Sequence, residues 1–109
     1  MTYEELSHFT WGDLSSLTWG DLEQPINVLY ERYRDSQLPL TVNTAEQMER
    51  LIHKLPEDLK PVTMPETVGD SISLLKRIQG SHVFQTAVDA GIVALVTKLI
   101  EYLIHCLHH

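Results

Sequence analysis

The chain has 109 residues, 43% of them hydrophobic, and a formal net charge of −7. This length supports one domain with a modest core. Its Lys and Arg residues are dispersed, which argues against nucleic acid as a partner, because phosphate recognition needs clustered basic side chains. A single cysteine excludes an intrachain disulfide framework. No secretory signal opens the chain, so we expect a protein that is cytoplasmic at synthesis.

Three copies of an eight-residue phrase occupy residues 2–9, 10–17 and 18–25. Each copy places Thr, an aromatic residue, a variable residue, an acid and Leu in the same columns. Thr followed three residues later by an acid is a capping box, and the flanking apolar residues form a hydrophobic staple. The phrase therefore predicts a helix start, repeated three times, with these capping pairs: Thr2/Glu5, Thr10/Asp13 and Thr18/Asp21.

A period of eight does not match the helical turn, because a straight helix would rotate successive copies by about 80°. Gly12 and Gly20 weaken a long helix further. We therefore expect residues 1–24 to form an arm of short helical turns, separate from a helical domain at residues 25–109. The aromatic side chains then pack on the protein's own core, stack on a sugar ring, or anchor in a partner protein. We assign partner binding to Trp11, Leu14, Trp19 and Leu22.

The next elements follow in chain order. Pro25 suits the first position of a helix that ends near residues 35–36. Residues 38–42 are predicted to be extended, and Pro39 disfavours an edge strand there. A second helix is expected to start with a cap at residues 43–44 and to stop at Pro56. Residues 56–66 hold three prolines and no helical stripe, which predicts an extended connector.

Thr67 and Asp70 repeat the capping pattern before a third helix, which Gly80 should end. The last and most apolar helix is expected at about residues 82–107, with a length of about 40 Å. Its two adjacent apolar stripes make a face wider than a two-stranded seam needs, as in a helix central to a bundle or shared between subunits. We assign a homo-oligomer interface to this face: Ile92, Leu95, Val96, Leu99, Ile100 and Leu103.

Other chemistry finds little support in the sequence. Asp89, Lys98 and Glu101 interrupt the last helix, so a membrane span is disfavoured. His105 and His109 share a helix face, but no acidic ligand is close in sequence, and the end of a chain commonly frays. No catalytic motif is present. We therefore predict a protein that is not an enzyme and that has no cofactor and no metal.

The tandem phrases at residues 10–14 and 18–22 both read Thr-Trp-Gly-Asp-Leu. They resemble phrases near the start of short proteins, and in linker regions of tail proteins, from phages and prophages of Gram-positive bacteria. The resemblance covers about the first quarter of the chain. It implies a virion or tail-associated component, or a small protein from the neighbouring lysis genes.

Together these features predict a mainly α protein with a structural role, of the phage tail or baseplate type. It would self-assemble through its last helix, dock through its arm onto neighbouring virion proteins, and reside in the virion. Two alternatives stay open: a holin-like, membrane-active lysis accessory, and a small adaptor that binds a partner through Trp11 and Trp19.

Overall fold

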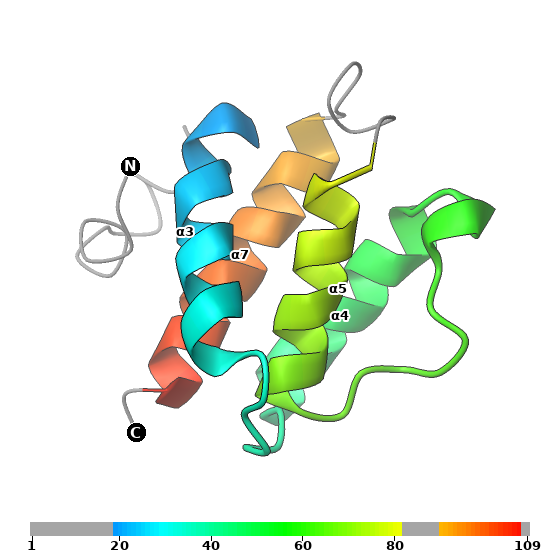
Figure 1. Cartoon of the computed structure of the whole chain (residues 1–109). Coiled ribbons are helices and arrows are strands. Elements are labelled where there is room, and N and C mark those ends of the chain that lie inside the picture. Colours follow the sequence, from blue (N-terminus) through cyan, green and yellow to red (C-terminus); the bar gives the residue numbers. More distant parts are fainter. Residues whose placement is uncertain (1–18, 82–89, 108–109) are drawn as a thin grey trace.

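The computed structural model describes residues 19–81 and 90–107 (Figure 1). This part of the chain is mainly helical, as expected from the sequence. Its α-helices are α3 (Trp19–Tyr33), α4 (Val42–Lys54), α5 (Val68–Gln79) and α7 (Ala90–Leu107), and a 3-10 helix, η1, spans Glu57–Leu59. The expected staircase of turns before Trp19, and the first eight residues of the expected last helix, lie outside the described residues.

Helix α7 holds the bundle together. Helix α3 packs mainly on α5 and helix α4 mainly on α7, while α7 also contacts α3 and α5. A helix with neighbours on three sides needs a wide apolar face, which explains the two adjacent stripes in its sequence. Its most buried side chains, all fully inaccessible to solvent, are Val96, Leu99, Ile100 and Leu103. The last helix is therefore central to this bundle.

Helix α3 corrects the expected boundary between the arm and the domain. The helix spans Trp19–Tyr33 with Pro25 inside it, so the expected helix start at Pro25 is wrong. A proline inside a helix costs about 3 kcal/mol. Leu22, Ile26 and Leu29 lie on one face at helical spacing and are all fully buried. Each contributes about 1.5–3 kcal/mol, so together they outweigh that cost. Residues 19–24 consequently belong to the helical domain.

Helix α4 begins one turn earlier than expected. Thr41, and neither residue 43 nor residue 44, is its N-cap, and the Thr41 side chain accepts a hydrogen bond from the Thr44 amide at 3.2 Å. This register turns the Thr44 side chain inward, where it is fully buried. Its hydroxyl lies 2.8 Å from Thr41 Oγ1 and 3.7 Å from Cys106 Sγ of α7. The contact between Thr44 and α7 thus favours Thr41 as the N-cap over the other suitable residues, 43 and 44.

The start of α5 follows the sequence prediction. Thr67 caps it by accepting a hydrogen bond from the Asp70 amide at 3.1 Å, and Gly80 ends it. The segment after α3 covers this start. Val68 N donates to Leu38 O at 2.8 Å, and Gly69 N donates to Ser36 O at 3.2 Å. A Cβ on Gly69 would lie 2.6 Å from Arg34 O, so only glycine permits this approach.

The extended stretch before α4 makes a minimal β contact, as its sequence suggested. Pro39 forms an isolated antiparallel bridge with Thr67, and Leu40 N donates to Glu66 O at 3.2 Å. The described residues contain no longer strand, because a proline cannot donate to a ladder.

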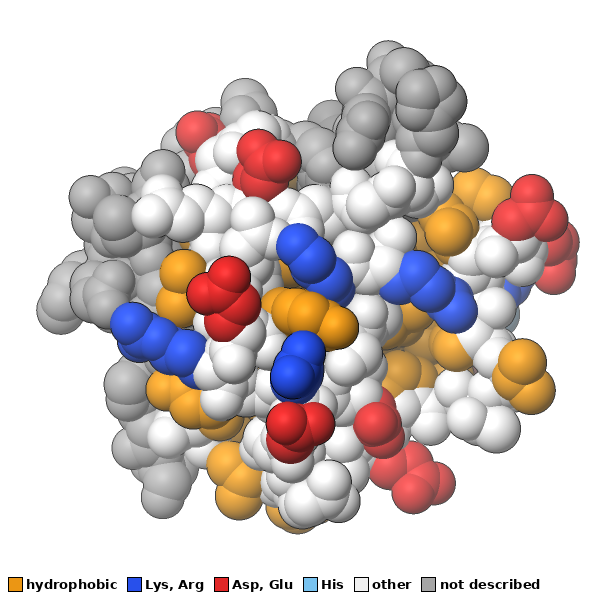
Figure 2. Space-filling model, in the orientation of Figure 1, with side chains coloured by type: hydrophobic (Ala, Val, Ile, Leu, Met, Phe, Trp, Pro, Cys, Tyr) orange, Lys and Arg blue, Asp and Glu red, His pale blue; other side chains and the backbone are white. Residues whose placement is uncertain are grey.

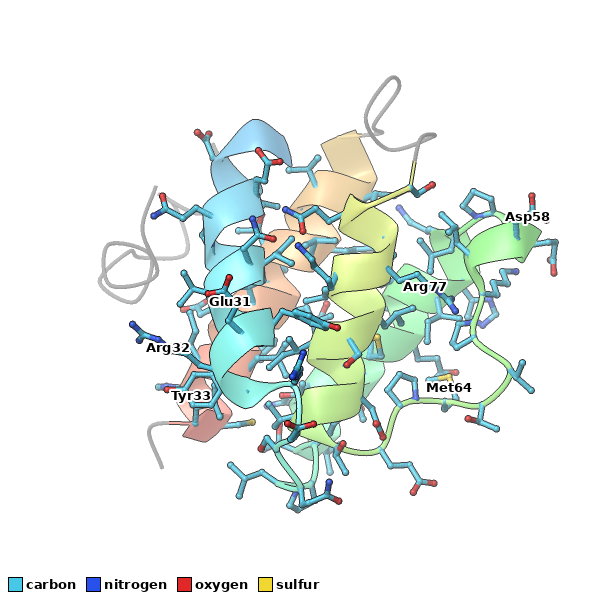
Figure 3. All side chains as sticks on the ribbon, viewed as in Figure 1. Glu31, Arg32, Tyr33, Asp58, Met64 and Arg77 are labelled. Carbon is cyan, nitrogen blue, oxygen red and sulfur yellow. The ribbon has the colours of Figure 1, made fainter. Side chains whose placement is uncertain are left out.

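The connector at residues 56–66 begins with η1, which the sequence did not predict, and then continues beside α5 without further helix. Arg77 reaches from α5 toward this connector (Figure 3), where its guanidinium donates to the Leu59 carbonyl. Val62 is fully exposed, and Met64 is 47% exposed. The connector is therefore held at its first half and presents apolar side chains to solvent at its second.

Basic side chains on the face of α3 and α5 are interleaved with acidic ones (Figure 2). Lys76 Nζ donates to Asn27 Oδ1 and lies 5.8 Å from the Tyr30 ring centroid. Arg34 approaches the same ring at 5.7 Å and pairs with Asp35 at 3.7 Å. Lys76 thus stabilises the contact between α3 and α5, and this face presents no continuous basic patch.

Candidate functional site

The structure describes two of the four residues that the sequence assigned to partner binding. Trp11 and Leu14 lie outside the described residues. Trp19 belongs to the first turn of α3. Leu22, which the sequence assigned to partner binding, is fully buried in the core of its own chain. The third copy of the repeat therefore contributes its Leu to the fold.

The residues assigned to an oligomer interface are also used within the chain. Ile92 is buried and Leu95 half-buried, while Val96, Leu99, Ile100 and Leu103 are fully buried. These side chains pack within the bundle, because α7 has α3, α4 and α5 as neighbours. This face is therefore occupied by the chain's own helices, and its assignment to contacts between subunits stays a prediction.

An apolar hollow lies where the start of α4 meets the end of α7. Its volume is about 400 Å³, within the range typical of ligand sites. One wall comes from the segment that leads into α4 and the other from the last turns of α7. The lining residues are Leu38, Pro39, Thr41, Asn43, Tyr102, His105 and Cys106. We call this site the α4–α7 hollow.

The side chains of the α4–α7 hollow suit an aromatic or aliphatic guest. Leu38 is 46% exposed at its edge, and Tyr102 and Cys106 are half-buried. Thr41 and Asn43 stand at the N-terminal end of α4, where the helix dipole favours negative charge. None of the lining residues is Asp, Glu, Lys or Arg. The hollow is thus apolar within and polar at its edge.

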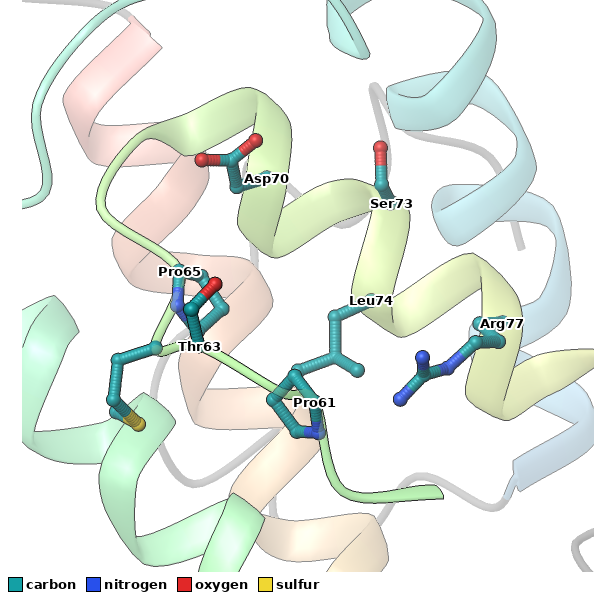
Figure 4. A pocket seen from close by; sticks show the side chains of 8 residues that line it. Pro61, Thr63, Pro65, Asp70, Ser73, Leu74 and Arg77 are labelled. Carbon is teal, nitrogen blue, oxygen red and sulfur yellow. The ribbon is translucent and has the colours of Figure 1, made fainter. Parts of the chain in front are cut away.

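Two further hollows flank the extended connector, and both contain a carboxylate. The first, of about 340 Å³, lies between the connector and α5 (Figure 4), with Asp70 at one end and Arg77 at the other. The second, of about 410 Å³, lies toward α4 and includes Glu49 and Lys60. Each of these two hollows contains both an acidic and a basic side chain, so each is less suited than the α4–α7 hollow to an apolar guest.

One carboxylate near the α4–α7 hollow is electrostatically unusual. Glu101 lies on α7 one turn before His105, and its Oε2 atom is buried without a hydrogen-bond partner. Burial raises the pKa of Glu101 above its ordinary value of 4.5, and the neighbouring His105 partly opposes that rise.

Within the described ranges, no three His, Cys, Asp or Glu side chains come together in a way that could hold a metal ion. The helices described here are too short or too polar to cross a bilayer. No protein family model, curated protein or solved structure matches this chain.

No pattern in the sequence predicted the α4–α7 hollow. Its two walls are more than 60 residues apart along the chain and meet through Thr44 and Cys106. One local signal was available: Pro39 between two leucines in a segment too short for a helix predicts an apolar loop. Nothing in that pattern tells which helix end the loop faces.

Proposed function

We propose that this protein is a non-enzymatic structural component of the phage tail or baseplate type, whose N-terminal repeats bind neighbouring virion proteins. The proposal is based mainly on the position of the third repeat in the structure. Its residues 19–24 form the first turns of α3, and its Leu22 is fully buried. The eight-residue phrase thus starts a helix, and its Leu side chain packs against an apolar surface.

The first two copies of the phrase, residues 2–17, have the same residue types at the same positions. Leu14 corresponds to Leu22, and Trp11 corresponds to Trp19. In the domain, α3, α4, α5 and α7 fill the core with their own side chains. The first two repeats carry further apolar groups in the same columns, and we take these as the binding element of the arm.

The buried face of α7 shifts the proposed assembly away from that helix. Since Val96, Leu99 and Leu103 are fully buried within one chain, separating them for a partner would unfold the bundle. Assembly in this proposal therefore depends on the arm. A small adaptor protein that uses Trp11 and Trp19 would share this binding element and differ in its partner.

Two measurements test the proposed function. Quantitative mass spectrometry of purified phage particles should find this chain in a fixed ratio to the tail proteins. Capture of co-expressed neighbouring tail proteins should fall at least about tenfold for Trp11→Ala. The control is Val62→Ala, which changes a fully exposed apolar residue on the connector and should leave capture unchanged.

The outcomes separate the candidate functions. A chain abundant in the lysate and missing from purified particles would refute the virion role. Arm-dependent capture of a protein that is not part of the particle would favour the adaptor instead. Capture that Trp11→Ala leaves intact would exclude the arm as the binding element.

A further inference from the structure

We propose that residues 60–65 of the connector form a site of limited proteolysis, and that cleavage there converts the chain into a stable complex of two fragments. The enzyme class that fits this site is a protease with a small apolar specificity pocket. The inference goes beyond the proposed function and does not depend on it.

The middle of the connector is accessible to an enzyme. Val62 is fully exposed, and its neighbours Thr63 and Met64 are exposed as well. The connector loops out at one side of the bundle (Figure 1), and hollows of about 340 and 410 Å³ flank it toward α5 and toward α4. Little packing therefore holds this segment in place, and exposed loops of this kind are where proteolytic nicking concentrates.

The backbone of residues 61–65 can also adopt the strand-like form in which a protease binds its substrate. The connector is fixed near its two ends, where Leu59 O accepts a hydrogen bond from Arg77 and Glu66 O accepts one from Leu40 N. Among the hydrogen bonds found in the described part of the chain, none involves residues 61–65. Straightening this segment therefore breaks no hydrogen bond.

The residues of the connector restrict the class of protease. Lys60 is its only basic residue, and Pro61 follows directly, so a trypsin-like enzyme meets a tertiary amide without an N–H group. Pro65 protects the bond after Met64 in the same way. The bond after Val62 is unprotected, and Val62 offers the small aliphatic side chain that the specificity pocket of elastase accepts.

Cleavage at this bond leaves the helices intact. Hydrolysis adds one water molecule across the Val62–Thr63 peptide bond, which leaves a carboxylate on Val62 and an ammonium group on Thr63. Both residues are exposed, so the two new charges stay in water. The cut lies between η1, which ends at Leu59, and α5, which begins at Val68, so no helical hydrogen bond is lost.

The helices on the two sides of the cut depend on each other for burial. Helix α3 packs mainly on α5 and α4 mainly on α7, whereas α3 and α4 make little contact with each other. Leu29 of α3 and Leu51 of α4 are nevertheless fully buried. Their apolar faces are thus covered by helices that follow the connector, and separating the fragments would expose both faces to water.

Hydrogen bonds join the same two parts at both ends of α5. At its start, Val68 N donates to Leu38 O at 2.8 Å. Near its end, Gln79 Nε2 donates to Glu23 O of α3 at 3.1 Å. None of these groups belongs to residues 60–65, so all these bonds remain after cleavage. The two fragments should therefore stay associated as a folded bundle.

Limited digestion of the native full chain with pancreatic elastase tests the proposal. Mass spectrometry of the denatured digest should show cleavage inside residues 61–64 at least about tenfold faster than cleavage within α3, α4, α5 or α7. Native mass spectrometry of the same sample should show the fragments from the two sides of the cut still bound to each other. Far-UV circular dichroism should match that of the uncleaved protein.

Val62→Lys separates accessibility from side-chain preference. It should slow elastase cleavage after this residue at least about tenfold, because a small apolar pocket rejects a long charged side chain. Trypsin should then cut after the same position, although it leaves the connector of the wild type intact. The matched control, Val42→Lys, makes the same change at a residue 75% exposed on α4 and should leave elastase cleavage of the connector unchanged.

Three results would overturn the inference. A connector that elastase cleaves no faster than the helices would show that this segment is not accessible. Fragments that separate after cleavage under native conditions would show that the bundle needs a continuous chain. Resistance of Val62→Lys to trypsin at this position would show that the backbone cannot enter a protease cleft.

Discussion

Helices α4 and α5 start with the same capping chemistry and place it in opposite surroundings. Thr41 and Thr67 each accept a hydrogen bond from the amide three residues later, at 3.2 and 3.1 Å. At α5 the segment after α3 covers the first turn, and Val68 is fully buried. At α4, Val42 is 75% exposed and the first turn borders a hollow. The start of α5 therefore contributes to the core, whereas the start of α4 leaves the surface around the α4–α7 hollow open to solvent.

The largest expected effect contrasts a core residue with one at the edge of the α4–α7 hollow. Leu22→Ala removes a fully buried side chain and should lower the free energy of unfolding by about 3 kcal/mol. Leu38→Ala, at a side chain 46% exposed, should change it by less than about 0.5 kcal/mol. Urea denaturation of both variants measures the difference. Equal losses would mean that the edge of the hollow is part of the core.

Gly69→Ala tests the covered start of α5. Its Cβ would lie 2.6 Å from Arg34 O and 2.7 Å from Ser36 O, and neither backbone atom can rotate away. We expect a loss of about 2 kcal/mol. In Gly80→Ala the nearest atom lies at 3.6 Å, so this control should stay within about 0.5 kcal/mol of the wild type. Thermal melts that place both variants together would contradict the close packing at Gly69.

The two caps themselves sharpen the comparison. Thr41→Ala should cost about 1–2 kcal/mol, because its bonds to the buried Thr44 are partly shielded from water. Thr67→Ala should cost about 0.5–1 kcal/mol, since its bond to the Asp70 amide is exposed and water can replace it. Chemical denaturation of the pair gives the order. A greater loss for Thr67→Ala would show that the covering segment after α3 matters more than the exposure of the capping bond.

The smallest effect concerns Glu101, whose pKa is raised by burial. The folded state then holds this proton more tightly than the unfolded state, so stability from this group falls as pH rises from about 4.5 through the raised pKa. Glu101→Gln should gain a few tenths of a kcal/mol at pH 7 and nothing below pH 4.5. Melting temperatures at both pH values check this.

Glu31→Gln, which removes an exposed carboxylate from α3 (Figure 3), controls for the change in net charge. A loss of stability in Glu101→Gln at neutral pH would contradict a desolvated Glu101 and would point to a favourable interaction of its charged form.

Sequence patterns predicted the features of this fold that are local. Thr67, Asp70 and Gly80 mark α5 correctly, because capping involves residues within one turn of one another. The same logic failed at α4, where Thr41, Asn43 and Thr44 are all suitable caps. There the choice depends on burying Thr44 against Cys106, a contact between residues 62 positions apart.

Pro25 and the face of α7 show the same limit at larger scale. A proline reads locally as the start of a helix, yet the burial of Leu22 and Ile26 on either side keeps α3 continuous. The stripes of α7 correctly indicated a wide contact, and they left its partners undetermined. A pattern gives the width of a buried face, whereas the topology decides whether α3, α4 and α5 or a second molecule cover it.

The position of Cys106 has a practical consequence. It is the only cysteine in 109 residues, and it lines the α4–α7 hollow. The chain thus has one thiol, and a guest bound in the hollow would shield it from solvent. No additional cysteine has to be introduced to report on this site. Its alkylation rate with iodoacetamide should decrease when a guest fills the hollow, which gives a chemical footprint of hollow occupancy at a single defined atom.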